Sequence, residues 1–469
     1  MADTVWRGRT LSLVVRSLGL TAAVCASCLV IGMATAWATT RLRLPGGAAW
    51  LMLAALPLAV PSYVSAYGWL ATFPGWSGFV PSWLILTAVS TPYVTLPVAA
   101  ALRSADPAPA EVARSLGRGP TEAWRTATLP QLAPAAGAGT LLVALYVLSD
   151  FGAVSMFRFP VFTFAIQRQY ESFIGRDSAV VLALMLAVIA LTLVAGERRL
   201  RGRGERWRTG SGVRRPPEPI DPGRWAAPVM AGMFVLPVIA LVVPVVALFR
   251  RLGEGTSRSL QWDELVAAVV GTVGVSAAAA LVVLLLAIPI GALAARYRGR
   301  AVAAVETGGY TGHALPGIVV ALSLVYFSLR IVPDLYQTTA VLVFAYAVLF
   351  LPKAIGATRG SISLVSPQLA LTARSLGRGP VAAQRSTTWR LASPGIAAGA
   401  LLVMLTAMKE LPATLILRPT GYETLATEIW SRTNASAYGA AAPYALALLV
   451  LAALPAFWLS RPQAWEGPR

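Results

Sequence analysis

The chain has 469 residues, of which 57% are hydrophobic and 13% charged, whereas a soluble domain carries roughly 25% charged residues. Its formal net charge is +19, and its arginines gather in short segments between long apolar runs. This composition excludes an ordinary soluble domain and is typical of a membrane protein whose basic loops face the cytoplasm. We therefore expect a lipid bilayer, and no nucleic acid, as the partner.

Charge-free runs long enough to cross a bilayer start close to the N-terminus. In the first part of the chain they are expected at 17–39, 48–72, 80–102, 131–149 and 178–196. The first run continues to Thr40, which is too long for the apolar core of a secretory signal, so we interpret it as a retained span. It also holds the only cysteines, Cys25 and Cys28, which are interpreted as small buried hydrophobes.

An Arg-, Gly- and Pro-rich segment, 197–224, follows and is predicted to be a cytoplasmic linker. After it, further runs are expected at 225–249, 265–294, 307–329, 336–352, 393–408 and 440–460. These eleven runs predict an all-α polytopic membrane protein with two helix bundles, 1–196 and 225–469. Segments 157–175 and 418–436 are expected to be short loops or partly inserted segments. Prolines inside the runs are expected to bend helices, namely Pro57, Pro61, Pro97, Pro316 and Pro352.

One octapeptide occurs twice and relates the two bundles to each other. Ala113–Pro120 recurs letter for letter as Ala373–Pro380, 260 residues later, in polar loops that we place at 104–130 and 359–392. Other residues match at similar offsets: Pro61 with Pro316, Pro134 with Pro394, Gly139 with Gly399, Asp150 with Glu410, and Arg158 with Arg418. A duplicated membrane unit is typical of transporters. The run 225–249 has no counterpart in the first half.

The orientation of the N-terminus is open at this point. Counting three spans back from a cytoplasmic Ala113 places the N-terminus outside, whereas Arg7, Arg9 and Arg16 favour the inside. Either the first half lacks a helix, or the sequence begins inside a longer reading frame.

The first loop carries a spaced motif made of Glu111, Ala113, Gly117, Leu129 and Pro130. It resembles the cytoplasmic loop of membrane subunits of binding-protein-dependent ABC importers, which reads Glu-Ala-Ala, three residues, Gly, nine residues, Ile-x-Leu-Pro. The second loop keeps Ala373 and Gly377 but has Leu371 in place of the Glu and Trp389-Arg390 in place of Leu-Pro. The resemblance implies a type I importer permease of the bacterial inner membrane, with two loops that couple to an ATPase and a cytoplasmic C-terminus.

A coupling loop needs a small apolar helix face that can seat in a groove of its partner. Val112, Ala113 and Leu116 are predicted to form that face in the first loop, and Ala373 and Leu376 in the second. The alternative is an interfacial helix that only anchors its loop. The chain has no Gly-x-x-x-x-Gly-Lys-Ser/Thr phosphate loop and we expect no catalytic residue and no cofactor in it. The resemblance implies that ATP and Mg bind a separate ATPase, present in two copies.

The resemblance also implies an extracytoplasmic binding protein that delivers substrate to 157–175 and 418–436. Met408–Thr414 and Leu417–Thr427 are similar to the ferric-ion subfamily of fused permeases, and thiamine, polyamine and other small-solute permeases are the alternatives. A secondary transporter that needs no ATPase is the rival from another class. It would require ionisable groups at mid-span, and none is clear.

Three charged residues near span ends are candidates for the substrate pathway: Asp150, Lys409 and Glu410. A carboxylate from each half would suit a transient oxygen-ligand site for a hard cation. The alternative is that they lie at the interface, with Lys409 neutralising Glu410. No resident metal site is assigned, because the two cysteines and the single histidine, His313, are too few.

Overall fold

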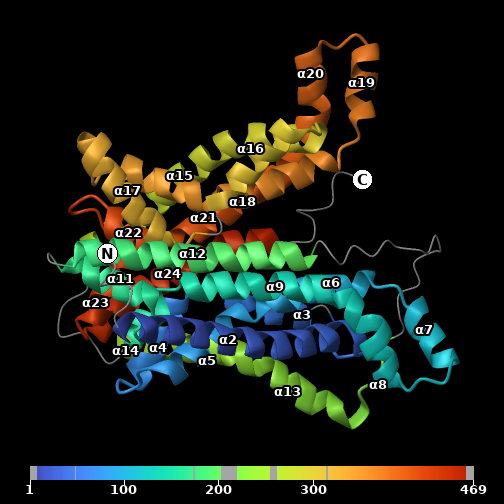
Figure 1. The fold of residues 1–469 in the computed structure, drawn as a ribbon, viewed down its shortest axis with the longest axis horizontal. Helices are drawn as coiled ribbons and strands as arrows, with labels where there is room; N and C mark the ends of the chain where they lie inside the picture. The colour runs from blue at the N-terminus through green and yellow to red at the C-terminus, as the bar shows by residue number, and fades with distance from the viewer. Residues whose placement is uncertain are drawn as a thin grey trace. The chain divides into compact units, whose positions relative to one another are not determined.

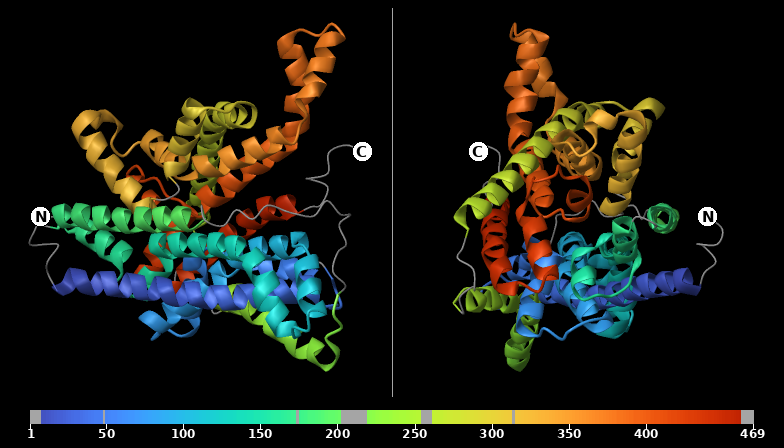
Figure 2. Two further views of the ribbon diagram at one scale, coloured as in Figure 1. Left: turned by 45° about the vertical axis from the view of Figure 1, so that its right-hand side comes forward. Right: turned by 90° about the vertical axis from the view of Figure 1, so that its left-hand side faces the viewer.

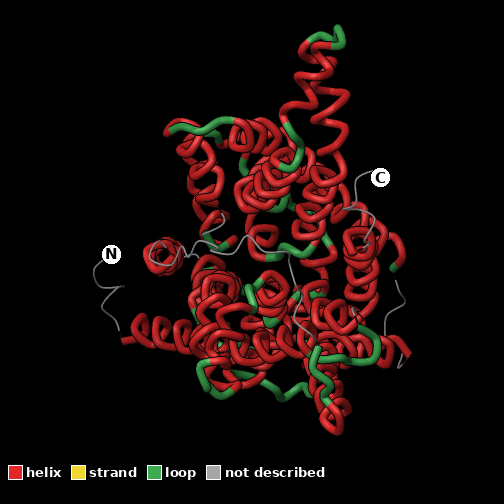
Figure 3. Tube along the Cα trace, turned by 90° about the vertical axis from the view of Figure 1, so that its right-hand side faces the viewer, coloured by secondary structure: helices red, strands yellow, loops and turns green. Residues whose placement is uncertain are grey.

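The computed structural model describes residues 8–47, 49–172, 175–201, 219–253, 261–312 and 315–460. These residues form helices joined by short loops, and the one extended pairing among them is an isolated bridge between Leu42 and Ile220 (Figure 3). His313 lies outside the described residues. The chain divides into two compact units, Met1–Arg250 and Arg251–Arg469.

Unit 1 contains the first copy of the repeat and one additional helical segment (Figure 1). The copy comprises α2 (Gly8–Arg41), α3 (Ala49–Ala55), η1 (Leu56–Ala59), α4 (Ser62–Thr72), α5 (Phe79–Ser90), α6 (Pro92–Ser104), α7 (Ala108–Ser115), α8 (Pro120–Ala123), η2 (Trp124–Thr128), α9 (Leu129–Ser149), α10 (Gly152–Met156), α11 (Phe162–Glu171) and α12 (Arg176–Arg201). The additional segment comprises η3 (Gly223–Trp225), α13 (Ala226–Pro237), η4 (Val238–Val242) and α14 (Val243–Gly253).

Unit 2 repeats this order of elements. It comprises α15 (Trp262–Arg296), α16 (Arg300–Thr311), α17 (Gly317–Ile331), η6 (Pro333–Leu335), α18 (Thr339–Ser363), α19 (Pro367–Ser375), α20 (Pro380–Gln384), η7 (Arg385–Trp389), α21 (Arg390–Met408), α22 (Pro412–Leu417), α23 (Leu425–Asn434) and α24 (Tyr438–Ser460). The segments expected as loops or partly inserted, 157–175 and 418–436, thus contain the helices α11 and α23.

The expected all-α polytopic architecture is confirmed. Among the described residues, eight helical segments are long and apolar enough to cross a bilayer. Ala49–Ala59 and Ser62–Thr72 form a ninth span if they are counted as one helix. This pair is bent by 84° at Pro61, one of the prolines predicted to bend a helix. The remaining two of the eleven expected runs are shorter apolar helices, Gly317–Ile331 and Tyr438–Ala453.

The two copies share a close helix contact. A Cβ on Gly139 of α9 would lie 2.6 Å from the Tyr93 carbonyl oxygen on α6, and a Cβ on Gly399 of α21 would lie 2.6 Å from the Ala357 Cβ on α18. Each glycine therefore lets the helix that follows the polar loop pack tightly on the helix that precedes it. This explains why the matching glycines recur.

A second shared contact fixes the end of each unit remote from its polar loop. The Phe162 amide at the start of α11 donates to Ser17 Oγ on α2 at 3.1 Å, and the Leu425 amide at the start of α23 donates to Thr272 Oγ1 on α15 at 2.8 Å. In each unit, a hydroxyl on the first long helix thus satisfies an amide that the short helix leaves unpaired.

The segment predicted to open the second half, 225–249, packs on unit 1 instead. Pro244 has no N–H, so it cannot donate a helical hydrogen bond to the preceding turn, where the carbonyls of Ile239 and Ala240 lie. Trp69 Nε1 donates to the Ile239 carbonyl at 2.9 Å, and Ser65 Oγ donates to the Ala240 carbonyl at 2.8 Å. Gly68, on the same helix α4, contacts Pro244 so closely that a side chain would not fit. The boundary between compact units therefore falls after Arg250, not before Trp225.

The predicted linker, 197–224, begins later than expected in the described part of the chain. Helix α12 continues through Arg201, and residues 202–218 lie outside the described part. Past them, the Ile220 amide donates to the Arg41 carbonyl at 2.7 Å, which ties the approach to α13 to the end of α2.

Candidate functional site

The two polar loops have the same backbone, a short helix, a tight turn and a second short helix that leads into a long one. Figures 1 and 2 show α7 and α8 at one end of unit 1, and α19 and α20 projecting from unit 2. In the first loop the Gly117 amide donates to the Arg114 carbonyl at 3.0 Å and the Arg118 amide to the Ala113 carbonyl at 3.1 Å. The second loop repeats both bonds at the same lengths, from Gly377 and Arg378.

These bonds form the turn that commonly ends a helix with a residue in the left-handed conformation. Gly117 has φ of 84° and Gly377 has φ of 85°, a region that side chains disfavour. Nothing lies within 4 Å of a Cβ placed on either residue, so the backbone angle alone requires glycine. Each polar loop therefore contains two short helices separated by this turn, not one continuous helix.

The apolar helix face that is predicted to contact a partner is only partly exposed. Val112 and Leu116 are 57% and 76% exposed, and Leu376 is 79% exposed, as a surface that awaits a partner would be. Ala113 and Ala373 are each only 8% exposed and face inward. Their small side chains let the loop close on itself. Glu111 is exposed in the first turn of α7, where the helix dipole favours an acid.

Leu129 and Pro130 lie half-buried at the start of α9, directly after the π-helical turn η2. Unit 2 has the same π-helical turn, η7, before Arg390. Since Arg390 stands where the first copy has Pro130, the proline is not the cause of the π geometry. Such turns are frequent at functional sites.

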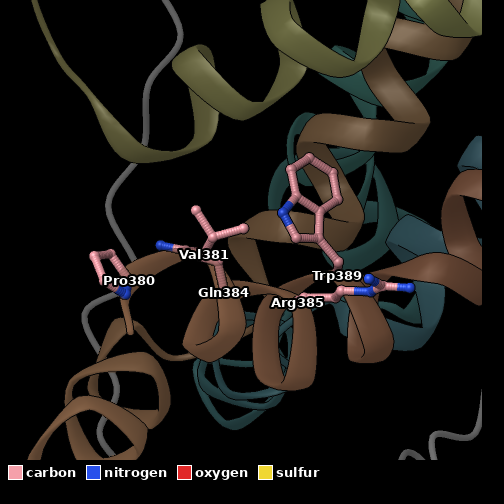
Figure 4. Close-up of a pocket in the computed structure, with 5 residues that line it drawn as sticks. All are labelled: Pro380, Val381, Gln384, Arg385 and Trp389. Atoms are coloured by element: carbon pink, nitrogen blue, oxygen red, sulfur yellow. The ribbon is translucent and has the colours of Figure 1, made fainter. Parts of the chain in front are cut away.

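Trp389 in the second loop borders a surface hollow of about 450 Å³ that is lined by Pro380, Val381, Gln384, Arg385 and Trp389. Figure 4 shows the side chains of Val381 and Trp389 projecting on the same side of this helix. Trp389 also packs against a buried cluster that includes Ile362 and Ile396. At the position equivalent to Trp389 the first loop has Leu129.

Asp150 is 7% exposed and lies where α9 ends and α10 begins. Its Oδ1 accepts from the amides of Ala153 at 3.0 Å and Val154 at 3.4 Å, and its Oδ2 accepts from Ser62 Oγ. Its own carbonyl accepts from Thr163 Oγ1 at 2.6 Å. The carboxylate therefore caps α10 and connects it to α4.

Glu410 has the same position between α21 and α22. Its carboxylate accepts from the amides of Ala413 at 2.9 Å and Thr414 at 3.0 Å, and from Thr414 Oγ1 at 2.8 Å. The residue equivalent to Ser62 is Gly317, and a Cβ there would lie 2.8 Å from Glu410 Oε1. The longer acid thus fills the space that a serine side chain fills in unit 1.

Sequence reasoning missed Ser62 and Thr414 as partners of these carboxylates, although the offset of 255 that relates Pro61 to Pro316 also relates Ser62 to Gly317. It also left Lys353 without a role. Lys353 Nζ donates to Thr406 Oγ1 at 3.1 Å and lies 5.2 Å from the centre of the Phe350 ring, so it connects α18 to α21. Lys409 follows directly after α21.

Among the described residues, no group of three or more His, Cys, Asp or Glu side chains could hold a metal ion. Cys25 and Cys28 are free thiols, and Cys28 is fully buried, as their position in an apolar run predicted.

Comparison with known proteins assigns the family. The family described as the inner membrane component of binding-protein-dependent transport systems matches residues 287–461. The Fe(3+)-transport system permease protein FbpB 2 of Haemophilus influenzae is 35% identical over 464 residues, which is 98% of this chain and 91% of that protein. The chain belongs to the binding-protein-dependent transport permeases.

Two molybdenum transport permeases match a shorter part of this permease. ModB of Mycobacterium tuberculosis is 31% identical over 198 residues, 36% of this chain and 71% of that protein. ModB of Escherichia coli is 31% identical over 173 residues, 34% of this chain and 73% of that protein. The permease is therefore a multi-pass membrane component of a transport system and not itself an enzyme.

Proposed function

We propose that the chain is the permease of an ATP-driven importer of ferric iron. The observation that carries this proposal is 35% identity, over 98% of the chain, to a permease named for Fe(3+) transport. The molybdenum permeases match only about a third of the chain. An importer of this kind receives its substrate from an extracytoplasmic binding protein, at the ends of the units that carry α11 and α23.

The energy comes from a separate ATPase that contacts both polar loops, one copy at α7 and one at α19. The support for this is the shared turn at Gly117 and Gly377, together with the exposed Val112, Leu116 and Leu376. Closure of the ATPase pair would move these loops, and the long helices that follow them would carry the motion to the bundles. Both loops, and with them the C-terminus, face the cytoplasm in this arrangement.

Asp150 and Glu410 extend the proposal to the substrate pathway, because each lies where a long helix following a loop is broken. Asp150→Asn keeps an acceptor for the two amides of its cap, whereas Glu410→Gln keeps only one of its two cap acceptors, and both substitutions remove the charge. We expect Asp150→Asn to melt at about the wild-type temperature, Glu410→Gln to melt somewhat lower because one cap amide loses its acceptor, and both to lose iron uptake. Retained uptake would remove both residues from the pathway and leave them as caps.

Uptake of radiolabelled ferric iron tests the substrate directly, in cells with and without this gene, with labelled thiamine, polyamine and molybdate in parallel. We expect loss of iron uptake alone. Loss of another solute instead would leave the importer architecture and contradict the iron assignment.

A further inference from the structure

Arg158 stands out as an arginine in a backbone position that normally belongs to glycine. It follows α10, with its amide donating to the Ser155 carbonyl at 3.0 Å and the Phe159 amide donating to the Val154 carbonyl at 2.9 Å. These bonds define the same helix-ending turn that the chain forms at Gly117 and Gly377. The φ of Arg158 is 52°, a conformation that is strained for a residue with a side chain.

Nothing that the Arg158 side chain contacts among the described residues offsets this backbone strain. The Arg158 side chain is exposed between two buried phenylalanines, Phe157 and Phe159, and no hydrogen bond or ion pair to its guanidinium occurs within the described ranges. At Gly117 and Gly377 the chain forms the same turn with glycine, which adopts this conformation without strain. A strained non-glycine residue is a reason to look for a function in its side chain.

The second copy of the repeat indicates what that side chain binds. The equivalent Arg418 has φ of −59° and donates to the Glu423 carboxylate and, at 3.4 Å, to Thr427 Oγ1. Glu423 belongs to a longer connection: residues 419–424 precede α23, whereas only 159–161 precede α11. Unit 1 thus retains the arginine but lacks the stretch that supplies its carboxylate.

The surface beside Arg158 is suited to a protein partner. The Gly78 amide donates to the Phe157 carbonyl at 2.7 Å, and the Phe79 ring lies 5.8 Å from the Phe159 ring. Phe79 and Val80 are 40% and 60% exposed. Helix α11, which follows this connection, lies at the end of unit 1 remote from α7 (Figure 1). Arginine and exposed aromatic side chains together are characteristic of protein interfaces.

We propose that Arg158 is a docking residue of the first half, where its free guanidinium takes a carboxylate from the extracytoplasmic binding protein. This inference rests on the proposed function, because it needs a binding protein. It makes the two halves unequal as receptors: unit 2 neutralises its arginine with its own Glu423, and unit 1 receives the carboxylate from the partner. The planar guanidinium fork also specifies how that carboxylate must approach.

The test is binding of the organism's purified ferric-ion-binding protein to the permease–ATPase complex in nanodiscs of phosphatidylcholine. Arg158→Gly relieves the backbone strain and removes the guanidinium, so its melting temperature should equal or exceed that of the wild type. Its affinity should fall about tenfold. Added salt should weaken the wild type more than this variant. Arg158→Lys, which keeps the charge, should retain part of the affinity.

Gln337→Gly is the control for relief of backbone strain. Gln337 has φ of 55° and lies outside 157–175 and 418–436, the segments expected to receive the binding protein. Relief of strain there should leave affinity unchanged. Equal affinity of Arg158→Gly and wild type would overturn the inference alone. An effect of Arg158→Gly that occurs only in nanodiscs containing phosphatidylglycerol would assign Arg158 to lipid and also overturn it. A wild-type complex that binds no such protein would overturn the proposed function and, with it, this inference.

Discussion

Two acids that cap short helices, Asp150 and Glu410, carry out one local task with different side-chain lengths. In unit 1 a serine, Ser62, reaches a short acid, and in unit 2 a longer acid reaches the space over Gly317. The equivalence of Asp150 and Glu410 could be predicted from the repeat. Their caps could not, because the sequence does not reveal that each acid faces the amides three and four residues ahead.

The fit between Gly317 and the longer Glu410 can be tested by substituting Gly317 first and then both residues. Gly317→Ser should force Glu410 Oε1 away from the Ala413 amide and cost about 1–3 kcal/mol. Adding Glu410→Asp recreates the arrangement of unit 1 and should recover most of the loss. Thermal unfolding of the purified permease measures both effects.

Gly360→Ser is the control, because a Cβ on Gly360 meets nothing within 4 Å and should change the melting temperature little. A double variant no more stable than Gly317→Ser alone would contradict the compensation.

At the scale of elements, apolar runs predicted most helices, because hydrophobic length determines what can cross a bilayer. The interruptions were harder to predict. The 84° bend at Pro61 was anticipated, because proline bends helices. That Leu116 is exposed while Ala113 is buried depends on where α7 ends and could not be anticipated. The octapeptide indicated a shared function of the loops, but their helix–turn–helix geometry required the backbone.

The turn in the coupling loop provides a prediction with an internal control. Gly117→Ala imposes a side chain at φ of 84° and should cost about 1–2 kcal/mol locally, displacing α7 and reducing co-purification of the ATPase. Gly119→Ala, two residues on at φ of −63° and equally free of contacts, should retain the ATPase. Pull-down of the ATPase with each variant measures this.

Gly377→Ala and Gly379→Ala form the same pair in the second loop, at φ of 85° and −61°. ATPase retention by Gly117→Ala equal to that of Gly119→Ala would contradict a coupling role for this turn.

At the scale of the whole molecule, the repeat predicted two related halves but misplaced one helical segment. Composition marks a linker at 197–224, and linker composition says nothing about which neighbour the next helix will contact. The deciding interactions are specific: Trp69 and Ser65 donate to the carbonyls of Ile239 and Ala240, in the turn before Pro244. That complementarity lies between residues far apart in the sequence and is visible only in the structure.

Separate expression of fragments 1–201 and 219–469 tests this packing. We expect the two fragments to co-purify, because α13 and η4 of the second fragment pack on α3, α4 and α5 of the first. Trp69→Phe with Ser65→Ala leaves both carbonyls unsatisfied and should reduce recovery of the pair. Trp225→Phe, at an indole that is 61% exposed, should not. Fragments that migrate separately in size-exclusion chromatography would contradict the assignment of this segment to unit 1.

The central claim, an ATP-driven permease for ferric iron, is tested most directly by transport in proteoliposomes that hold the permease and its ATPase. The binding protein loaded with radiolabelled ferric iron is supplied outside, and ATP is enclosed inside. We predict iron accumulation that requires hydrolysable ATP and the binding protein, and that Gly117→Ala reduces but Gly119→Ala does not. Accumulation without ATP, driven by an imposed ion gradient, would contradict this account and identify a secondary transporter.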